Sequence, residues 1–163
     1  MASTSLTRNH LRPWQWIITG GLIAGALDIL YAMAYWWLKA GVGPARILQS
    51  VAAGLIGKEQ AVAGGQATAA LGAVLHFGIA LAMAYAYYAA SDRWPALLRR
   101  PVFYGALYGL LLYAIMNYVV VPLSAAGPSS SSQPMSWLVL SIAAHVVLVG
   151  IPCALASRYA RRA

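Results

Sequence analysis

The chain alternates four long apolar stretches with short connections that carry most of its charge. The stretches run over residues 14–38, 65–90, 102–121 and 135–159. Each reaches about the 20 apolar residues that a helix needs to cross the hydrocarbon core of a bilayer. The pattern therefore predicts an all-α integral membrane protein with four transmembrane helices. Because the connections are too short for a further domain, we expect one domain over residues 1–163.

A shorter helix is predicted between the first and second stretches, over residues 44–56. Pro44 suits its first turn, apolar residues follow at helical spacing, and Gly57 ends it. Arg46 and Gln49 fall where they can reach water, which makes the helix amphipathic. Such a helix lies on the outer membrane surface or dips over the bundle as a lid. Arg46 and Gln49 are then candidate lid or rim residues.

Composition and charge agree with this class and exclude others. Hydrophobic residues make up 61% of the chain, charged residues 9%, and the mean hydropathy is +0.69, which excludes an ordinary soluble domain. The net charge of +8 does not indicate nucleic-acid binding, because the basic residues follow membrane topology. Most arginines share a side with the two termini, and only Lys39, Arg46 and Lys58 fall on the other side. By the positive-inside rule, both termini are cytoplasmic.

One strongly polar residue lies deep inside each apolar stretch. These residues are Asp28, His76, Asn117 and His145. At 1.5 Å per residue, the acid and both histidines lie about 15 to 16 Å below the outer ends, near the midplane, and the asparagine lies nearer the outside. Ionisable groups at that depth cost a few kcal/mol, so they face a bundle interior, a partner or a water-filled path. We expect an outward-opening polar site, with Tyr31 and Tyr113 extending its hydrogen-bond network.

Small residues lie on the same helix stripes as the polar ones. Gly21 and Gly25 form a GxxxG motif whose stripe continues to Asp28, and Gly105 and Gly109 form a second motif in the third stretch. In a bilayer such motifs let helix backbones approach closely. The polar residues are therefore expected to face neighbouring helices rather than lipid. The same stripes also suit self-association into a homo-oligomer.

A proline interrupts the last stretch. Pro152 has no backbone N–H, and its ring collides with the carbonyl one turn earlier, near Leu148. The sequence therefore predicts a kink in the fourth transmembrane helix at this point.

The polar layer has four chemical interpretations. In the first, its members satisfy one another and only hold the bundle together. In the second, they bind or pass a proton, an ion or a small polar solute, because protonation of Asp28 and the histidines can be coupled to occupancy. In the third, His76 and His145 are axial haem ligands, or join Asp28 in a two-histidine, one-carboxylate metal site. In the fourth, Asp28 and a histidine are the acid and base of a membrane enzyme, although no substrate-binding motif accompanies them.

We predict the second of these functions. A site that binds or passes a proton, ion or small solute uses the shared depth of Asp28, His76 and His145, and it needs no further motif. We expect no enzymatic activity, no resident cofactor and no nucleic-acid partner. The partners expected are the lipid bilayer and a small ligand.

Several short runs also carry a resemblance to known proteins. They are residues 43–50, residues 64–65 followed by 75–77, and residues 116–118 followed by 122–124. These runs resemble those of small uncharacterised bacterial inner-membrane proteins of the YagU type, over most of the chain. The resemblance implies a multi-span protein of a bacterial inner membrane, and it implies no catalytic residues.

Overall fold

The structure, a computed structural model, describes residues 12–127 and 134–163. The elements are α1 (Pro13–Ala40), α2 (Pro44–Ile56), α3 (Lys58–Ala63), α4 (Gly65–Arg93), α5 (Ala96–Arg99), α6 (Pro101–Ile115), η1 (Met116–Val120), α7 (Val121–Leu123), α8 (Met135–Ala144), η2 (His145–Gly150) and α9 (Ile151–Ala160). Every element of the described ranges is helical, as predicted. The serine-rich run at 129–132, for which the sequence predicts a tether, lies outside the described residues.

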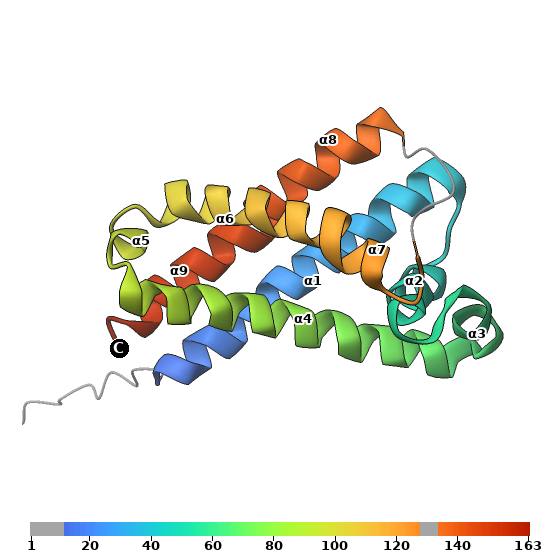
Figure 1. Cartoon of the computed structure of the whole chain (residues 1–163), viewed down its shortest axis with the longest axis horizontal. Coiled ribbons are helices and arrows are strands. Elements are labelled where there is room, and N and C mark those ends of the chain that lie inside the picture. The colour runs from blue at the N-terminus through green and yellow to red at the C-terminus, as the bar shows by residue number, and fades with distance from the viewer. Residues whose placement is uncertain (1–11, 128–133) are drawn as a thin grey trace, which may run out of the picture.

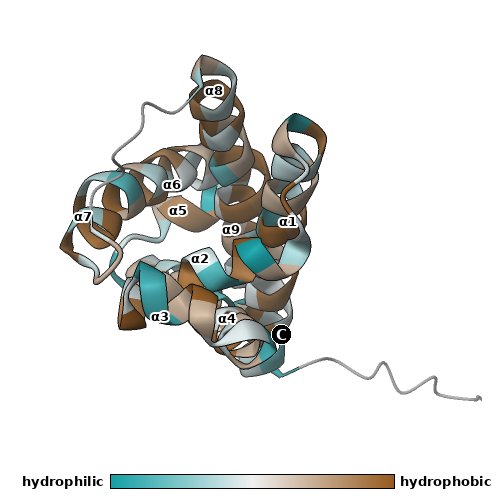
Figure 2. Ribbon diagram, turned by 90° about the vertical axis from the view of Figure 1, so that its right-hand side faces the viewer, coloured by the Kyte–Doolittle hydropathy of each residue, from teal (hydrophilic) through white to brown (hydrophobic). Residues whose placement is uncertain are grey.

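Within the described residues, four helical segments are long and apolar enough to cross a membrane. They are α1, α4, the continuous run α6–η1–α7 and the continuous run α8–η2–α9. Large apolar side chains are exposed on each, including Leu30, Val74, Leu111 and Val147, and hydrophobic segments are visible on α1, α4, α6 and α8 (Figure 2). These surfaces suit contact with lipid. The four predicted spans are confirmed, and the chain is a multi-pass helical membrane protein.

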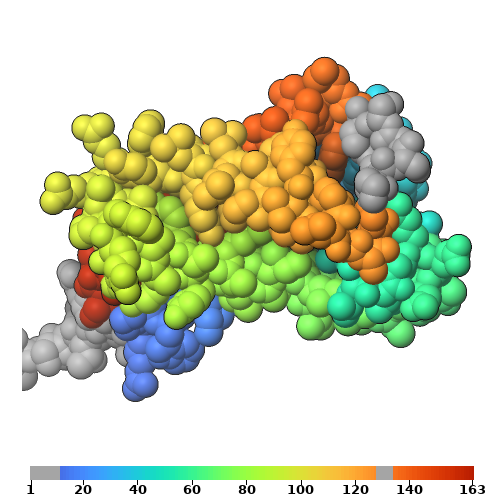
Figure 3. Space-filling model, in the orientation of Figure 1, coloured from blue at the N-terminus to red at the C-terminus, as the bar shows by residue number. Residues whose placement is uncertain are grey.

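The last span is the centre of the bundle. Its segment α9 packs against α1, α4 and α6, while η2 packs against α6 and α1. The start of α1, α5 and the C-terminus lie at one end of the bundle, which we call the terminal end (Figure 1). Helices α2 and α3 lie at the opposite end, which we call the α2 end. The space-filling view shows α6 and α7 lying over α4 (Figure 3).

Apolar and aromatic side chains fill the half of the bundle at the terminal end. The core includes Tyr87, Leu112 and Cys153, all nearly inaccessible to solvent. The Tyr108 hydroxyl donates a hydrogen bond to the Met83 carbonyl at 2.8 Å, and the Tyr87 and Tyr108 rings meet edge to face with centroids 5.1 Å apart. These contacts tie α4 to α6. The bundle interior is therefore packed closed over this half.

An arginine joins the ends of α4 and α9. The Arg161 guanidinium lies 2.6 Å from the Asp92 carboxylate, donates to the Tyr88 carbonyl at 3.1 Å, and stacks over the Tyr88 ring at 3.8 Å. The ion pair and the cation–π contact are each worth up to about 1 kcal/mol at exposed sites. Together they hold the C-terminal segment against the second span.

Both GxxxG motifs lie at close helix contacts, as predicted. A Cβ atom on Gly21 would lie 3.1 Å from the Leu81 Cα atom of α4. A Cβ atom on Gly105 would lie 2.9 Å from the Ile151 Cα atom of α9. Side chains at these positions would force the backbones apart, so the glycines set the helix spacing.

Two widened helical turns precede prolines. In η2 the Ile151 N–H bonds to the Val146 carbonyl, five residues back, and in η1 the Val121 N–H bonds to the Met116 carbonyl in the same way. Each turn ends just before a proline, Pro152 or Pro122, because proline cannot bond to the carbonyl four residues earlier and the helix readjusts. The predicted distortion at Pro152 thus takes the form of a π-helical turn. Such turns are frequent at functional sites.

Candidate functional site

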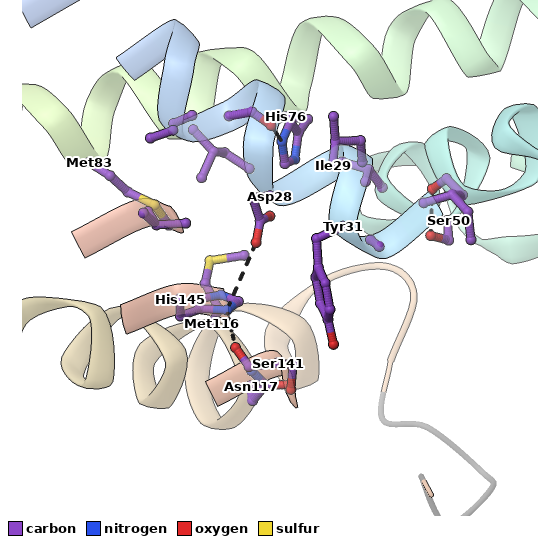
Figure 4. A pocket seen from close by; sticks show the side chains of 18 of the residues that line it. Asp28, Ile29, Tyr31, Ser50, His76, Met83, Met116, Asn117, Ser141 and His145 are labelled. Carbon is purple, nitrogen blue, oxygen red and sulfur yellow. Dashed lines mark hydrogen bonds and ion pairs between the residues drawn. The ribbon is translucent and has the colours of Figure 1, made fainter. Parts of the chain in front are cut away.

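A pocket of about 260 Å³ lies between the four spans in the half of the bundle nearest α2 (Figure 4). Its lining comes from all four spans and from α2. The polar residues of the lining, apart from two tryptophans, are Asp28, Tyr31, Ser50, His76, Asn117, Ser141 and His145. The four polar residues that the sequence singles out, one per span, therefore line a single pocket.

Asp28 lies in α1 and points across the pocket toward His145 (Figure 4). The Asp28 Oδ1 and His145 Nδ1 atoms are 4.0 Å apart, with side-chain exposures of 23% and 17% respectively. This distance is too long for a hydrogen bond. The His145 Nδ1–H instead donates to the Ser141 carbonyl at 2.9 Å, because a carbonyl can only accept. Among the described residues Asp28 makes no hydrogen bond through its side chain, so its carboxylate remains available.

The second histidine is also fixed by a backbone carbonyl. The His76 Nε2–H of α4 donates to the Gly25 carbonyl of α1 at 2.8 Å. Gly25 brings the two helices together here, because a Cβ atom on it would lie 3.0 Å from the Phe77 ring and from Ala80. The GxxxG motif therefore also orients His76.

Widened turns hold the other two polar residues of the layer. His145 is the first residue of η2, and Asn117 lies in η1. A Cβ atom on Gly109 would lie 2.8 Å from the His145 carbonyl carbon, so α6 packs directly on the turn that carries His145. The Tyr113 ring packs edge to face on the His145 ring at 5.4 Å. Tyr113 itself does not line the pocket, and its contact is with the His145 ring.

Aromatic rings from α1 and α8 form one wall of the pocket. Tyr31 stacks on Trp137 with ring centroids 5.8 Å apart, and Trp36 lies 5.2 Å from the same ring. All three line the pocket. The Tyr35 hydroxyl shares a 2.7 Å hydrogen bond with the Ser136 hydroxyl and joins the two helices beside this wall. The Tyr31 hydroxyl is buried and has no hydrogen-bond partner in the described part of the chain.

Trp36 and Trp137 lie near the outer ends of the first and last apolar stretches, where the sequence alone predicts only that they belong to an interfacial belt of aromatic residues. They form the wall only because α1 and α8 lie side by side, and the sequence of either helix alone does not show this. The one signal in the sequence was their proximity in depth to Tyr31 at the outer ends of both spans.

Helix α2 covers the pocket from the α2 end. Its residues Ile47, Ser50 and Val51 contribute to the lining. The helix sits tightly on α4, because a Cβ atom on Gly72 would lie 2.7 Å from the Leu48 carbonyl carbon. The Ala125 N–H donates to the Gly54 carbonyl at 2.9 Å and links the segment after α7 to the same helix. This helix thus packs over the spans rather than standing apart from them.

The expectation that Gln49 reaches water is wrong. Gln49 is buried, and its Nε2–H donates to the Gly65 carbonyl at 2.9 Å. The bond joins α2 to the first residue of α4, so Gln49 anchors the helix instead of forming a rim. Arg46 is exposed. Neither residue lines the pocket, which takes Ser50 from the same helix.

The three-ligand metal site gains no support from the geometry. Within residues 12–127 and 134–163, no three His, Cys, Asp or Glu side chains lie close enough together to hold a metal ion. Asp28, His76 and His145 therefore share a pocket without forming a two-histidine, one-carboxylate cluster.

Comparisons with known proteins identify a family without a function. A family model described as "Protein of unknown function (DUF1440)" matches residues 39–151, more than two thirds of the chain. The match includes His76, Asn117 and His145, whereas Asp28 precedes it. Searches of curated proteins and of solved structures returned no significant match.

Proposed function

The chain belongs to the DUF1440 family, whose function is unknown, and we therefore propose a function from its pocket: it binds a small polar solute at Asp28. One observation carries the proposal. The Asp28 carboxylate faces a pocket of about 260 Å³ without a hydrogen bond from the described residues, and its nearest basic nitrogen is 4.0 Å away. A carboxylate at membrane depth is costly unless partners satisfy it. A bound solute supplies those partners.

Binding is favoured over open conduction by the packing beneath the pocket. Along α1, α4 and η2, the lining residues nearest the terminal end are Ala24, Met83 and Val149. Beyond them lies the closed core around Tyr87 and Tyr108. A solute passing across the membrane requires these side chains to separate in a second conformation. Binding from one side is therefore the primary activity that we propose, and passage depends on such a change.

The proposal predicts a compound that copurifies with the protein. Small molecules extracted from purified wild type are compared by mass spectrometry with those from Ala32→Phe and Ala34→Phe. Ala32 lines the pocket, whereas Ala34 is exposed on the same helix, so only the first substitution fills the pocket. We expect wild type and Ala34→Phe to retain the same compound and Ala32→Phe to lose it. Equal compound profiles in all three proteins would contradict solute binding.

We further propose that the protein lies in a bacterial inner membrane with its terminal end in the cytoplasm. The support is the distribution of positive charge. Arg93, Arg99, Arg100 and the C-terminal arginines lie at the terminal end, and Lys39, Arg46 and Lys58 at the α2 end. Bacterial inner-membrane proteins keep the more basic side inside.

Labelling single cysteines tests this orientation. Cys153 is buried and is first replaced by alanine. In that background Lys58→Cys reports the α2 end, and Arg99→Cys reports the terminal end. An impermeant maleimide added to intact spheroplasts should label only Lys58→Cys, and detergent should make both accessible. Labelling of Arg99→Cys alone in spheroplasts would reverse the topology.

A further inference from the structure

Five polar side chains of the pocket each donate a hydrogen bond to a backbone carbonyl. His76 and His145 each donate one ring N–H, to Gly25 and Ser141 respectively. Three more side chains do the same: Asn117 Nδ2–H to Tyr113 at 3.0 Å, Ser50 hydroxyl to Ile47 at 2.6 Å, and Ser141 hydroxyl to Leu138 at 3.2 Å. The donors left over in the described lining are the Tyr31 hydroxyl, the second Asn117 N–H and the indole N–H groups of Trp36 and Trp137. The lone pairs of the two neutral imidazoles, the two serine hydroxyls, the Asn117 amide oxygen and the Asp28 carboxylate outnumber them, so the pocket is rich in acceptors.

The charge of the lining also favours a ligand that donates hydrogen bonds and carries a positive charge. Asp28 is the acidic side chain of the lining, and among the described residues neither lysine nor arginine lines the pocket. The other candidate cations are His76 and His145, and each already gives an N–H to a backbone carbonyl. The pocket therefore offers a negative charge with no fixed positive partner. An anion would meet repulsion here, and a cation would find its counter-ion.

The remaining lining suits an apolar body that carries positive charge. Tyr31, Trp36 and Trp137 present aromatic rings, and Met83 and Met116 add polarisable thioethers. The faces of aromatic rings attract ammonium groups electrostatically. The volume of about 260 Å³ is below the roughly 300 to 1,000 Å³ of pockets that take drug-sized ligands. The occupant is consequently small.

We propose that the ligand is a small organic cation, a protonated amine with a short apolar body. Its N–H groups bond to the Asp28 carboxylate and to the acceptors around it, and its body packs against Tyr31, Trp36 and Trp137. This inference rests on the proposed function and names the chemical class of the solute. It uses every feature that distinguishes this pocket from an apolar void: acceptors in excess, one uncompensated acid, and an aromatic wall.

The test uses three probes of the same chain length and different charge. Purified full-length protein in detergent is titrated calorimetrically with n-butylammonium chloride, n-butanol and sodium butyrate. We expect saturable binding of n-butylammonium at least tenfold tighter than that of butanol or butyrate. Asp28→Asn should reduce the ammonium affinity to that of butanol, and Ala32→Phe should remove binding. Ala34→Phe, which leaves the pocket unfilled, should bind as wild type does.

Other outcomes overturn the inference and separate it from the proposed function. If butanol binds as tightly as n-butylammonium, the pocket selects apolar bodies such as lipid chains, and the cation class is wrong. If butyrate binds best and Ala32→Phe removes it, solute binding stands while the ligand is an anion. If none of the probes binds, the cation class is wrong, and the copurified compound alone decides whether a solute is bound.

Discussion

Replacing Asp28 by asparagine is expected to abolish retention of the pocket solute and to leave the bundle at least as stable as wild type. The substitution keeps the shape of the side chain and removes its charge. Hydrogen bonds to charged groups contribute about 1.5 to 3 kcal/mol, so the affinity should fall by a factor of about 10 to 100. After the solute has been removed from both proteins, the free energy of unfolding should not fall, because Asp28 makes no hydrogen bond to the described residues and a charge at this depth is costly. Solute content and unfolding are both measured on purified protein.

Asp92→Asn is the matched control for this prediction. It makes the same chemical change at the terminal end, where Asp92 pairs with Arg161 at 2.6 Å. We expect this variant to retain the solute and to lose up to about 1 kcal/mol of stability, since the pair is partly exposed. The two variants thus have opposite effects. If Asp28→Asn is instead clearly destabilised and its solute content unchanged, the polar layer only holds the bundle together.

Replacing Gly72 by valine is expected to displace α2 and to empty the pocket. A side chain there would overlap the backbone of α2 at Leu48 and lie 3.3 Å from the Ala52 nitrogen. Overpacking of this kind costs about 1 to 3 kcal/mol. Since α2 provides part of the lining through Ser50 and Val51, its displacement should also release the solute. The measurements are thermal unfolding and solute content of the purified variant.

Gly78→Val separates this effect from a general intolerance of valine in α4. Gly78 lies six residues further along the same helix, and in the described part of the chain no atom of another helix lies within 4 Å of its Cβ position. We expect stability and solute content close to those of wild type. Similar losses in both variants would show that the contact between α2 and α4 is not what closes the pocket.

The spans and their polar layer could be predicted because each depends on its own helix. The long apolar stretches determined the four membrane-length helices, and the boundaries agree to within three residues. The GxxxG stripes indicated which faces meet, as Gly21 and Gly105 show. Counting residues inward from the outer end of each helix predicted that Asp28 and His145 lie at the same depth in the membrane. The short helices α3 and α5 were missed, because they contain too few residues to show a period.

What could not be predicted depends on contacts between elements. Gln49 has the sequence context of an exposed residue, and only the docking of α2 beside Gly65 buries it. The turn η1 could not be predicted, because the apolar stretch at 102–121 continues through it without a change of pattern. The aromatic wall is likewise invisible in one dimension, since Tyr31 and Trp137 are far apart in sequence.

The comparison of compounds retained by wild type, Ala32→Phe and Ala34→Phe tests the central claim most directly, because its outcome does not depend on which solute is bound. Solute binding predicts a compound present in near-stoichiometric amount in wild type and Ala34→Phe and absent from Ala32→Phe. If filling the pocket at Ala32 leaves every retained compound in place, the pocket around Asp28 is not a binding site.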